Sequence, residues 1–251
     1  MNRLIAATAA LLALTIGAQA DPVKLGTEGA YPPFNYIDDA GKLGGLDVDL
    51  GNELCKRAGL ECEWVVNEWD TLIPNLVAGN YDAILADMTI TAERQKTIDF
   101  TEAYFPPDPS KYLSMTGTSF DYAALKGLRI GAQTGTIQAN WLNENLKADN
   151  TILTYEVVDQ AVADLNAGNL DLLLAEGSYV GEQVAGSSGA LKSDGPDVPI
   201  GEGAGIGLRK ADTALRDQLN KALAEAKADG WLDALITKHF PNMGPGPFFK
   251  P

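Results

Sequence analysis

The 251-residue sequence predicts an α/β protein made of two similar lobes. Three observations support this prediction. Apolar runs of about five residues alternate with amphipathic segments of about ten, as in βα units with mainly parallel sheets. Gly59 and Gly79 end two of the amphipathic segments, as glycine commonly does after a helix. Finally, residues 76–87 (LVAGNYDAILAD) resemble residues 165–176 (LNAGNLDLLLAE).

The elements follow from apolar periodicity and from capping and stop residues. A turn is expected at 38–41 between two short extended pieces, and prolines break the chain at 105–109. We expect strands at 23–27, 62–66, 82–86, 128–132, 151–155, 171–175 and 204–208, an extended run at 111–115, and helices at 47–58, 69–78, 91–98, 136–147, 159–167, 178–185, 212–229 and 231–239.

The repeated segments each contain a helix end, a Gly-Asn turn, an apolar strand and a final acid. The alternative to a true repeat is that the two segments share, by coincidence, the turn and helix-stop residues common in α/β proteins. If the two lobes face each other, Asp87 and Glu176 point into the same cleft.

Residues 1–20 have the features of a cleaved secretory signal. A basic start at Arg3 is followed by an apolar stretch from Leu4 to Ala18 and by the small-x-small motif 18–20. The alternative, a membrane anchor, needs about 20 apolar residues, and this stretch is shorter. We therefore expect a soluble, exported, periplasmic protein.

Charge and cysteines restrict the function further. The net charge of −15 becomes −16 once Arg3 is removed, which argues against nucleic acid or an anionic membrane as partner. Export favours a disulfide between Cys55 and Cys62, joining a helix end to the next strand. His239 is the only histidine and lies far along the chain, so no metal site is expected.

The segment 82–94 suggests a small-molecule site. An apolar strand ends at Ala86, a polar loop follows, and Thr91 is suited to cap a helix that carries Arg94 in its first turn. Open α/β sheets bind ligands beyond the carboxyl ends of their strands. A guanidinium can hold a carboxylate by two hydrogen bonds, so the ligand is expected to bear one.

Several motifs, in this order, resemble the periplasmic solute-binding proteins of polar amino-acid ABC importers, especially the lysine/arginine/ornithine- and histidine-binding proteins. The resemblance covers essentially the whole mature chain. The motifs are 26–34 (GTEGAYPPF), 45–50 (GLDVDL), 55–62 (the cysteine pair), 69–74 (WDTLIP), 89–94 (TITAER), 98–101 (IDFT), 131–136 (GAQTGT), 207–210 (GLRK) and 229–230 (DG).

The resemblance implies the two-lobe periplasmic-binding-protein fold (type II), with two hinge strands near Tyr112 and Gly203. Lobe one would comprise 22–110 plus 203–243 and lobe two 114–199, with 244–251 as a C-terminal tail. It also implies a monomer without cofactor that delivers an amino acid to an inner-membrane ABC permease.

The resemblance also assigns the ends of the ligand. Arg94 matches the arginine that clamps the α-carboxylate, and a solvated helix face is the alternative for it. Glu176 falls where the family has an aspartate that accepts the α-ammonium, and it is one methylene longer. Thr136 and the amide of Ile137 are expected to reach the same carboxylate from the other side. Thr89 matches a serine or threonine that helps to hold the ligand, and Met88 is a further expected ligand-binding residue.

For the ligand side chain, the resemblance implies a sandwich between Tyr31 and Trp69, with core packing as the alternative for Trp69. Glu28 lies where binders of basic amino acids carry an acid, and Gln133 lies where relatives vary with their ligand. Asp87 departs from the serine or glycine of relatives, and it could also turn away to bond local amides.

Charge arithmetic then favours a cationic amino acid. Arg94 and Glu176 neutralise the zwitterion, so Glu28 and Asp87 are surplus negative charges, which are costly to bury unpaired. Lysine, ornithine or arginine would pair them, while histidine, glutamine or an opine remain alternatives. A rival class is a dehydratase on the same fold, but the sequence offers no catalytic triad or nucleophilic cysteine, so we expect no enzyme.

Overall fold

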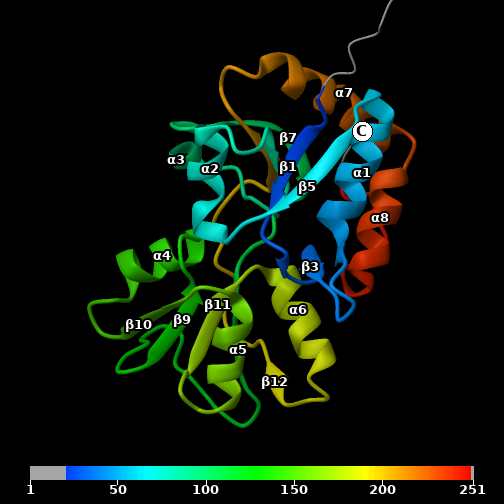
Figure 1. The fold of residues 1–251 in the computed structure, drawn as a ribbon. Helices are drawn as coiled ribbons and strands as arrows, with labels where there is room; N and C mark the ends of the chain where they lie inside the picture. The colour runs from blue at the N-terminus through cyan, green and yellow to red at the C-terminus, as the bar shows by residue number, and fades with distance from the viewer. Residues whose placement is uncertain (1–20, 250–251) are drawn as a thin grey trace, which may run out of the picture.

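Figure 1 shows a computed structural model of the chain, which describes residues 21–249. The predicted signal at 1–20 lies outside the described residues. Strands and helices form two groups, one around β1, β5 and α1 and the other around β9, β10 and α5 (Figure 1). Within residues 21–249, no helix is long and apolar enough to cross a membrane.

Each group contains a five-stranded sheet. The first has the order β5-β1-β6-β13-β7 and the second β10-β9-β11-β8-β12, while β2-β3-β4 form a small antiparallel sheet. The strands are β1 (Val23–Thr27), β2 (Ala30–Tyr31), β3 (Asn35–Ile37), β4 (Leu43–Gly44), β5 (Cys62–Val66), β6 (Ala83–Ile84), β7 (Asp99–Phe105), β8 (Lys111–Met115), β9 (Arg129–Gln133), β10 (Thr151–Tyr155), β11 (Leu172–Ala175), β12 (Leu191–Lys192) and β13 (Ala204–Leu208).

The helices cover the faces of these sheets (Figure 1). They are α1 (Leu46–Ala58), α2 (Leu72–Ala78), α3 (Ala92–Gln95), α4 (Ile137–Asn145), α5 (Val158–Asn166), α6 (Gly177–Gly186), α7 (Thr213–Ala228) and α8 (Trp231–His239), with 3-10 turns at Trp69–Thr71 and Pro241–Met243.

The expectation of mainly parallel sheets was wrong for half of the main pairings. Strands β1 and β9 pair in parallel with both of their neighbours. In contrast, β13 and β8 pair antiparallel with theirs, because each follows a segment that crosses from one group to the other and enters its sheet from the opposite end.

The sequence repeat corresponds to a structural one. Strand β6 lies beside β1 in the first sheet, and β11 lies beside β9 at the same place in the second. Before each strand a helix ends at a glycine with positive φ, 82° at Gly79 and 74° at Gly168, a conformation that glycine adopts without steric cost. Asp87 and Glu176 therefore follow equivalent strands.

Two local expectations need correction. The helix expected at 91–98 is only α3, although Thr91 caps it as expected by accepting a hydrogen bond from the Arg94 N–H. The chain leaves the helix because residues 99–105 form β7, which pairs with β13 and was not predicted. The strand expected at 82–86 is reduced to β6.

Two segments connect the groups, one before β8 and one before β13. They pair with each other where Ser110 and Val198 exchange both backbone hydrogen bonds, at 2.9 and 2.8 Å. This ladder marks the hinge of the two-lobe fold.

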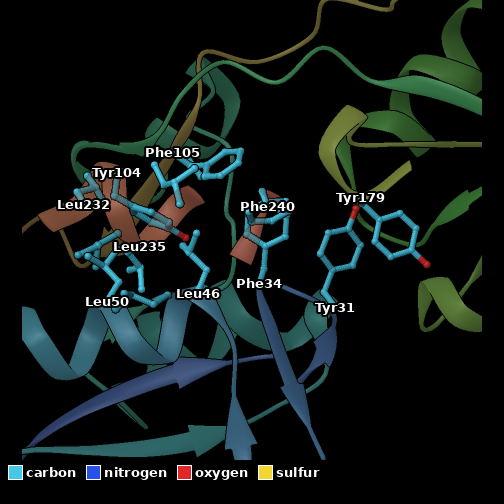
Figure 2. Close-up of a cluster of buried hydrophobic side chains, with 14 of the residues drawn as sticks. Tyr31, Phe34, Leu46, Leu50, Tyr104, Phe105, Tyr179, Leu232, Leu235 and Phe240 are labelled. Carbon is cyan, nitrogen blue, oxygen red and sulfur yellow. The ribbon is translucent and has the colours of Figure 1, made fainter. Parts of the chain in front are cut away.

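A row of buried aromatic rings runs from the first lobe into the second (Figure 2). Phe34 packs against Phe105 and Phe240, with centroids 5.0 and 4.6 Å away. Tyr31 continues the row and stacks on Tyr179 of α6 at 4.8 Å with an interplanar angle of 18°. The cores of the two lobes therefore meet beside the cleft.

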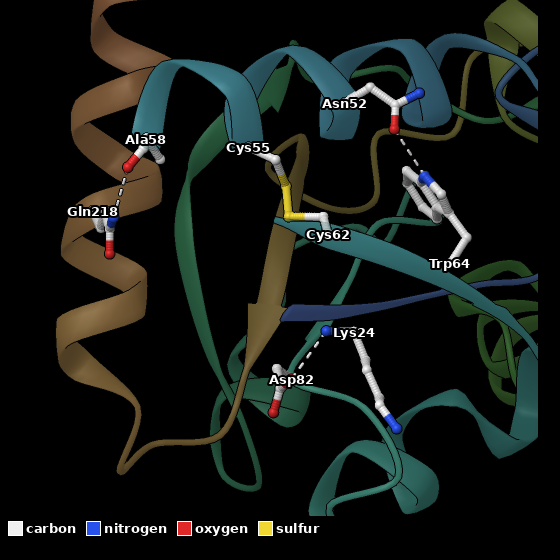
Figure 3. Close-up of a disulfide and its surroundings, with 8 residues drawn as sticks. All are labelled: Lys24, Asn52, Cys55, Ala58, Cys62, Trp64, Asp82 and Gln218. Carbon is white, nitrogen blue, oxygen red and sulfur yellow. Dashed lines mark hydrogen bonds between the residues drawn. A yellow bond between two sulfur atoms is a disulfide. The ribbon is translucent and has the colours of Figure 1, made fainter. Parts of the chain in front are cut away.

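The predicted disulfide is confirmed (Figure 3). Cys55 near the end of α1 is bonded to Cys62, the first residue of β5. Chain-entropy arithmetic for so small a loop gives roughly 2.5 kcal/mol of stabilisation. The bridge ties α1 to the edge strand of its sheet and lies away from the cleft residues.

Candidate functional site: an acid-rich cleft between the lobes

The cleft lies at the carboxyl ends of β1, β6, β9 and β11, where open α/β sheets bind ligands. Seven of the predicted residues meet there around about 240 Å³ of empty space. Together with Ala86, they are Glu28, Tyr31, Trp69, Asp87, Gln133, Thr136 and Glu176.

A second cavity, with about 280 Å³ of empty space, adjoins the first on the hinge side. Asp87 and Glu176 line both cavities and therefore stand between them. The other lining residues are Thr89, Ile137, Asp108, Phe105, Pro106, Ile200, Gly203 and Ala204.

Arg94 lies beside the cavities without lining either. Its Cζ is 5.2 Å from the centroid of the Trp69 ring, and its Nη1 donates to the Thr89 carbonyl at 2.7 Å. Burial lowers the pKa of Arg94 to about 10, against the attraction of Glu176 and Asp87. Among the described residues, the Thr89 carbonyl is the only hydrogen-bond acceptor for the Arg94 guanidinium. Most of the five guanidinium donors therefore remain available to an anion.

Thr136 begins α4 on the opposite side. Its hydroxyl accepts from the Ala139 N–H at 3.2 Å and donates to the Gln133 carbonyl at 2.7 Å. Thr136 and Ile137, at the start of this helix, line the two cavities, and helix N-termini are suited to bind anions. Met88 does not share this position: its side chain is 1% exposed in the core cluster of the first lobe.

Glu28 is already engaged across the cleft. Its Oε1 accepts from Gln133 Nε2 at 2.5 Å, and the same amide also donates to the Glu156 carbonyl. Burial, opposed by the Gln133 bond and reinforced by the charges of Glu176 and Asp159, raises the pKa of Glu28 to about 7.

Glu176 is engaged on both of its oxygens. Oε2 accepts from the Tyr31 hydroxyl of the other lobe, and Oε1 accepts from Gln138 Nε2 at 2.7 Å. Tyr31 itself stacks on Tyr179, as Figure 2 shows. The Glu176 side chain thus reaches a partner across the cleft.

A hydrogen bond from its backbone N–H holds Asp87 in place. Its φ is +48°, and its N–H donates to the Tyr104 hydroxyl at 2.9 Å. That hydroxyl donates to Asp47 Oδ1 at 2.7 Å, and Asp47 Oδ2 accepts from Asn35 at 2.8 Å. Asn35 in turn accepts from the Gly29 N–H at 2.7 Å, so one buried carboxyl supports the loops after both β1 and β6.

The Asp87 carboxyl has no hydrogen-bond or ion-pair partner within the described part of the chain. It does not turn away to local amides, the alternative left open by the sequence. Burial, followed by the charges of Glu176, Asp47 and Asp108, raises the pKa of Asp87 well above its usual value, and Arg94 only partly opposes them.

Sequence reasoning missed the residues that support the site. Gln138 lies two residues after Thr136, and Asp47 belongs to a recognised motif, yet neither had a role. Tyr104 lies on the unpredicted strand β7, and Tyr179 on a predicted helix whose packing the sequence does not reveal. Only the motif around Asp47 carried a signal that could have been followed.

The fold and the cleft define a two-lobe protein that encloses a small molecule between its lobes. The model of the bacterial extracellular solute-binding proteins, family 3, matches residues 23–242, so the chain belongs to that family.

Relatives and a solved structure agree with this assignment. The lysine/arginine/ornithine-binding periplasmic protein of Escherichia coli K12 is 34% identical, covering 96% of this chain and 97% of that protein. The histidine-binding periplasmic protein of Salmonella typhimurium LT2 is 37% identical, covering 87% of each. The crystal structure of a periplasmic His/Glu/Gln/Arg/opine family-binding protein from Silicibacter pomeroyi in complex with lysine has a TM-score of 0.81 and 45% identity, covering 89% of this chain and 99% of that one.

Proposed function

We propose that this protein is the substrate-binding component of an ABC importer and captures a cationic amino acid between its lobes. One observation carries the proposal: the buried or half-buried carboxyls of Glu28, Asp87 and Glu176 line one cleft, and Arg94 lies beside it against the Trp69 ring.

In this proposal Arg94 clamps the α-carboxylate, with the Thr89 hydroxyl and the amides at Thr136 and Ile137 completing its shell. The available guanidinium donors and the helix N-terminus support these roles. Met88 contributes at most its backbone, because its side chain is in the core.

The ligand side chain would run between Tyr31 and Trp69 toward Glu28, which pairs the distal cation. Gln133 holds Glu28 by a hydrogen bond and so tunes this end. Because burying a charged group without a partner is costly, the cationic side chain compensates the surplus of carboxyls.

The proposal also covers the protein's surroundings. The relatives are periplasmic binding proteins, which supports a cleaved signal at 1–20, a periplasmic monomer and a permease that recognises the closed form. Lobe boundaries of 22–110 plus 203–243 and 114–199 agree with the two sheets and with the Ser110–Val198 ladder. We propose no cofactor and no catalysis.

Isothermal titration of protein stripped of ligand by unfolding and refolding tests the function. Arginine, lysine, ornithine, histidine and glutamine are titrated separately, and tight binding confined to the cationic members is expected. Absence of binding by all five contradicts the proposal. Conversion of prephenate, followed by absorbance of its product, would instead establish the dehydratase alternative.

A further inference from the structure

We propose that Asp87, rather than Glu176, accepts the α-ammonium group of the bound amino acid, an inference that rests on the proposed function. It reverses the assignment carried over from the family resemblance. It also moves Asp87 from the side-chain end of the ligand, where charge arithmetic had put it, to the α-end.

The first step is that both oxygens of Glu176 already accept a hydrogen bond. One oxygen accepts from the Tyr31 hydroxyl and the other from Gln138 at 2.7 Å. Gln138 also donates to the Ser110 hydroxyl at 2.9 Å, so its amide is fixed beside the hinge ladder. An ammonium group at Glu176 would have to share an oxygen either with the Tyr31 bond, which joins the two lobes, or with the Gln138 bond.

The second step is that Asp87 is the cleft acid whose carboxyl is unpartnered. Asp87 is only 7% exposed, and it lines both cavities. The Tyr104 hydroxyl binds only its backbone N–H, within the part of the chain that the structure describes. The carboxyl oxygens of Asp87 are not sealed in the interior but open to the cleft, so a ligand ammonium group can reach them without breaking a hydrogen bond of the protein.

The third step is the place of Asp87 along the cleft. The α-ammonium and α-carboxylate share one carbon atom, so the acid that binds the ammonium must lie close to the carboxylate clamp. The charge of Arg94 interacts with both Glu176 and Asp87, whereas the charges that act on Glu28 come from Glu176 and Asp159. Asp87 also lines the second cavity together with Thr89 and Ile137, and Glu28 lines only the first. Asp87 therefore lies at the Arg94 end, and Glu28 at the other.

The backbone around Asp87 is built to keep its carboxyl in place. A positive φ is uncommon outside glycine but is several-fold enriched for aspartate and asparagine. The chain of bonds from Asp87 through Tyr104 to Asp47 holds the residue in that conformation. An ammonium group would then meet a pre-positioned acceptor, which lowers the cost of binding.

The experiment compares an amino acid with the same molecule lacking its α-amino group. The pair is chosen by what the wild type binds most tightly: lysine with 6-aminohexanoate, arginine with 5-guanidinopentanoate, or histidine with imidazolepropionate. Titration calorimetry measures both affinities for the wild type, Asp87→Asn, Glu176→Gln and, as a control at the distal end, Glu28→Gln. Asparagine tolerates the positive φ, and Asp87→Gly is a second variant that removes the carboxyl without strain.

We expect Asp87→Asn and Asp87→Gly to weaken the α-amino acid about thirtyfold and to leave the des-amino compound within about threefold. Glu176→Gln should change both compounds by a similar factor, since it acts through lobe closure. Glu28→Gln should weaken both, because both keep the distal cation.

The inference is overturned if Glu176→Gln removes the preference for the α-amino group while Asp87→Asn retains it. It is also overturned if the Asp87 variants weaken both compounds equally, which would put Asp87 at the distal cation. A wild type that binds none of these amino acids refutes the proposed function itself, and this inference with it.

Discussion

The loops that follow β6 and β11 begin from the same repeated sequence and end in different roles. Asp87 and Glu176 both follow the central strand of their five-stranded sheet, β6 and β11 respectively. Glu176 leads directly into α6 and accepts two side-chain hydrogen bonds, one of them from the opposite lobe. Asp87 adopts a positive φ in a longer loop, and its carboxyl accepts none among the described residues.

The comparison suggests a general point: acids at equivalent positions of two similar lobes need not have the same partners or the same role. The acid of lobe two accepts a hydrogen bond from lobe one, and under the inference above the acid of lobe one binds the ligand. The supporting contacts differ accordingly, because Gln138 bonds the Glu176 carboxylate while Tyr104 bonds only the Asp87 backbone. The predictions below test the two sides of this division.

Replacing Arg94 should have the largest effect, because the proposed function makes it the clamp on the α-carboxylate. Removing one partner of a buried charge pair costs roughly 3–5 kcal/mol, so Arg94→Ala should weaken amino-acid binding by at least about a hundredfold. Titration calorimetry measures the loss. Arg57→Ala is a matched control, since Arg57 also lies over an indole ring, that of Trp231 at 5.7 Å, but outside the cleft. Affinity of Arg94→Ala within a few-fold of the wild type would show that Arg94 is not the clamp.

Asp47 tests the support of the Asp87 loop through protein stability. Asp47→Ala leaves the Tyr104 hydroxyl and the Asn35 amide without their acceptor, at a cost of about 3 kcal/mol in the free energy of unfolding. Asp47→Asn should cost less, because the amide can still accept one of the two bonds. Urea denaturation at pH 7 measures both, and equal stability of all three proteins would contradict the role of this network.

The same residue predicts a pH dependence. Burial outweighs the bonds from Tyr104, Asn35 and the Asp87 backbone and raises the pKa of Asp47 to about 7. The folded state then binds the proton more tightly than the unfolded chain, so stability falls as pH rises from about 4 to about 7. Asp47→Asn should flatten part of this fall between pH 5 and 8. Asp171→Asn should not, because the bonds from Arg129 lower the pKa of Asp171 and move its effect below pH 4. An unchanged slope in Asp47→Asn would contradict the assignment.

Most of the fold was predictable because it depends on local patterns. Apolar periodicity gave nearly every strand and helix, and the repeat gave the equivalence of β6 and β11. Strand β7 was missed because Asp99–Phe105 is defined by its pairing with β13, which a local pattern does not record. The antiparallel strands were missed for the same reason, since their direction is set by where the chain crosses between lobes.

The residues that line the cleft were predictable, but the hydrogen bonds between them were not. Seven predicted residues line one cavity, because they follow strand ends that converge at one edge. The hydrogen bond from Tyr31 to Glu176 joins residues 145 positions apart, so no spacing rule could identify it. Whether an acid is free or engaged depends on such distant partners, which is why charge counting assigned Asp87 to the wrong end under the inference drawn here.

Tyr31→Phe addresses the lobe-two side of the comparison and should have the smallest effect. The variant keeps the ring at position 31, which packs against Phe34 and Tyr179. It removes only the hydroxyl that donates to Glu176. A hydrogen bond to a charged group contributes roughly 1.5–3 kcal/mol. In the open state water can bond both groups instead, so the net stabilisation of the closed state is smaller. The ligand-free protein should therefore open more, by about tenfold in the ratio of open to closed forms.

Small-angle scattering and a fluorophore pair across the cleft measure this opening without ligand. Tyr179→Phe is the matched control, because the Tyr179 hydroxyl contacts Asp159 of its own lobe at 3.3 Å and its removal leaves the bond between the lobes intact. A Tyr31→Phe protein that stays as closed as both the wild type and the control would show that the aromatic stack, rather than Glu176, holds the lobes together. Glu176 would then be free to bind the ammonium, and the division between the two loops would be lost.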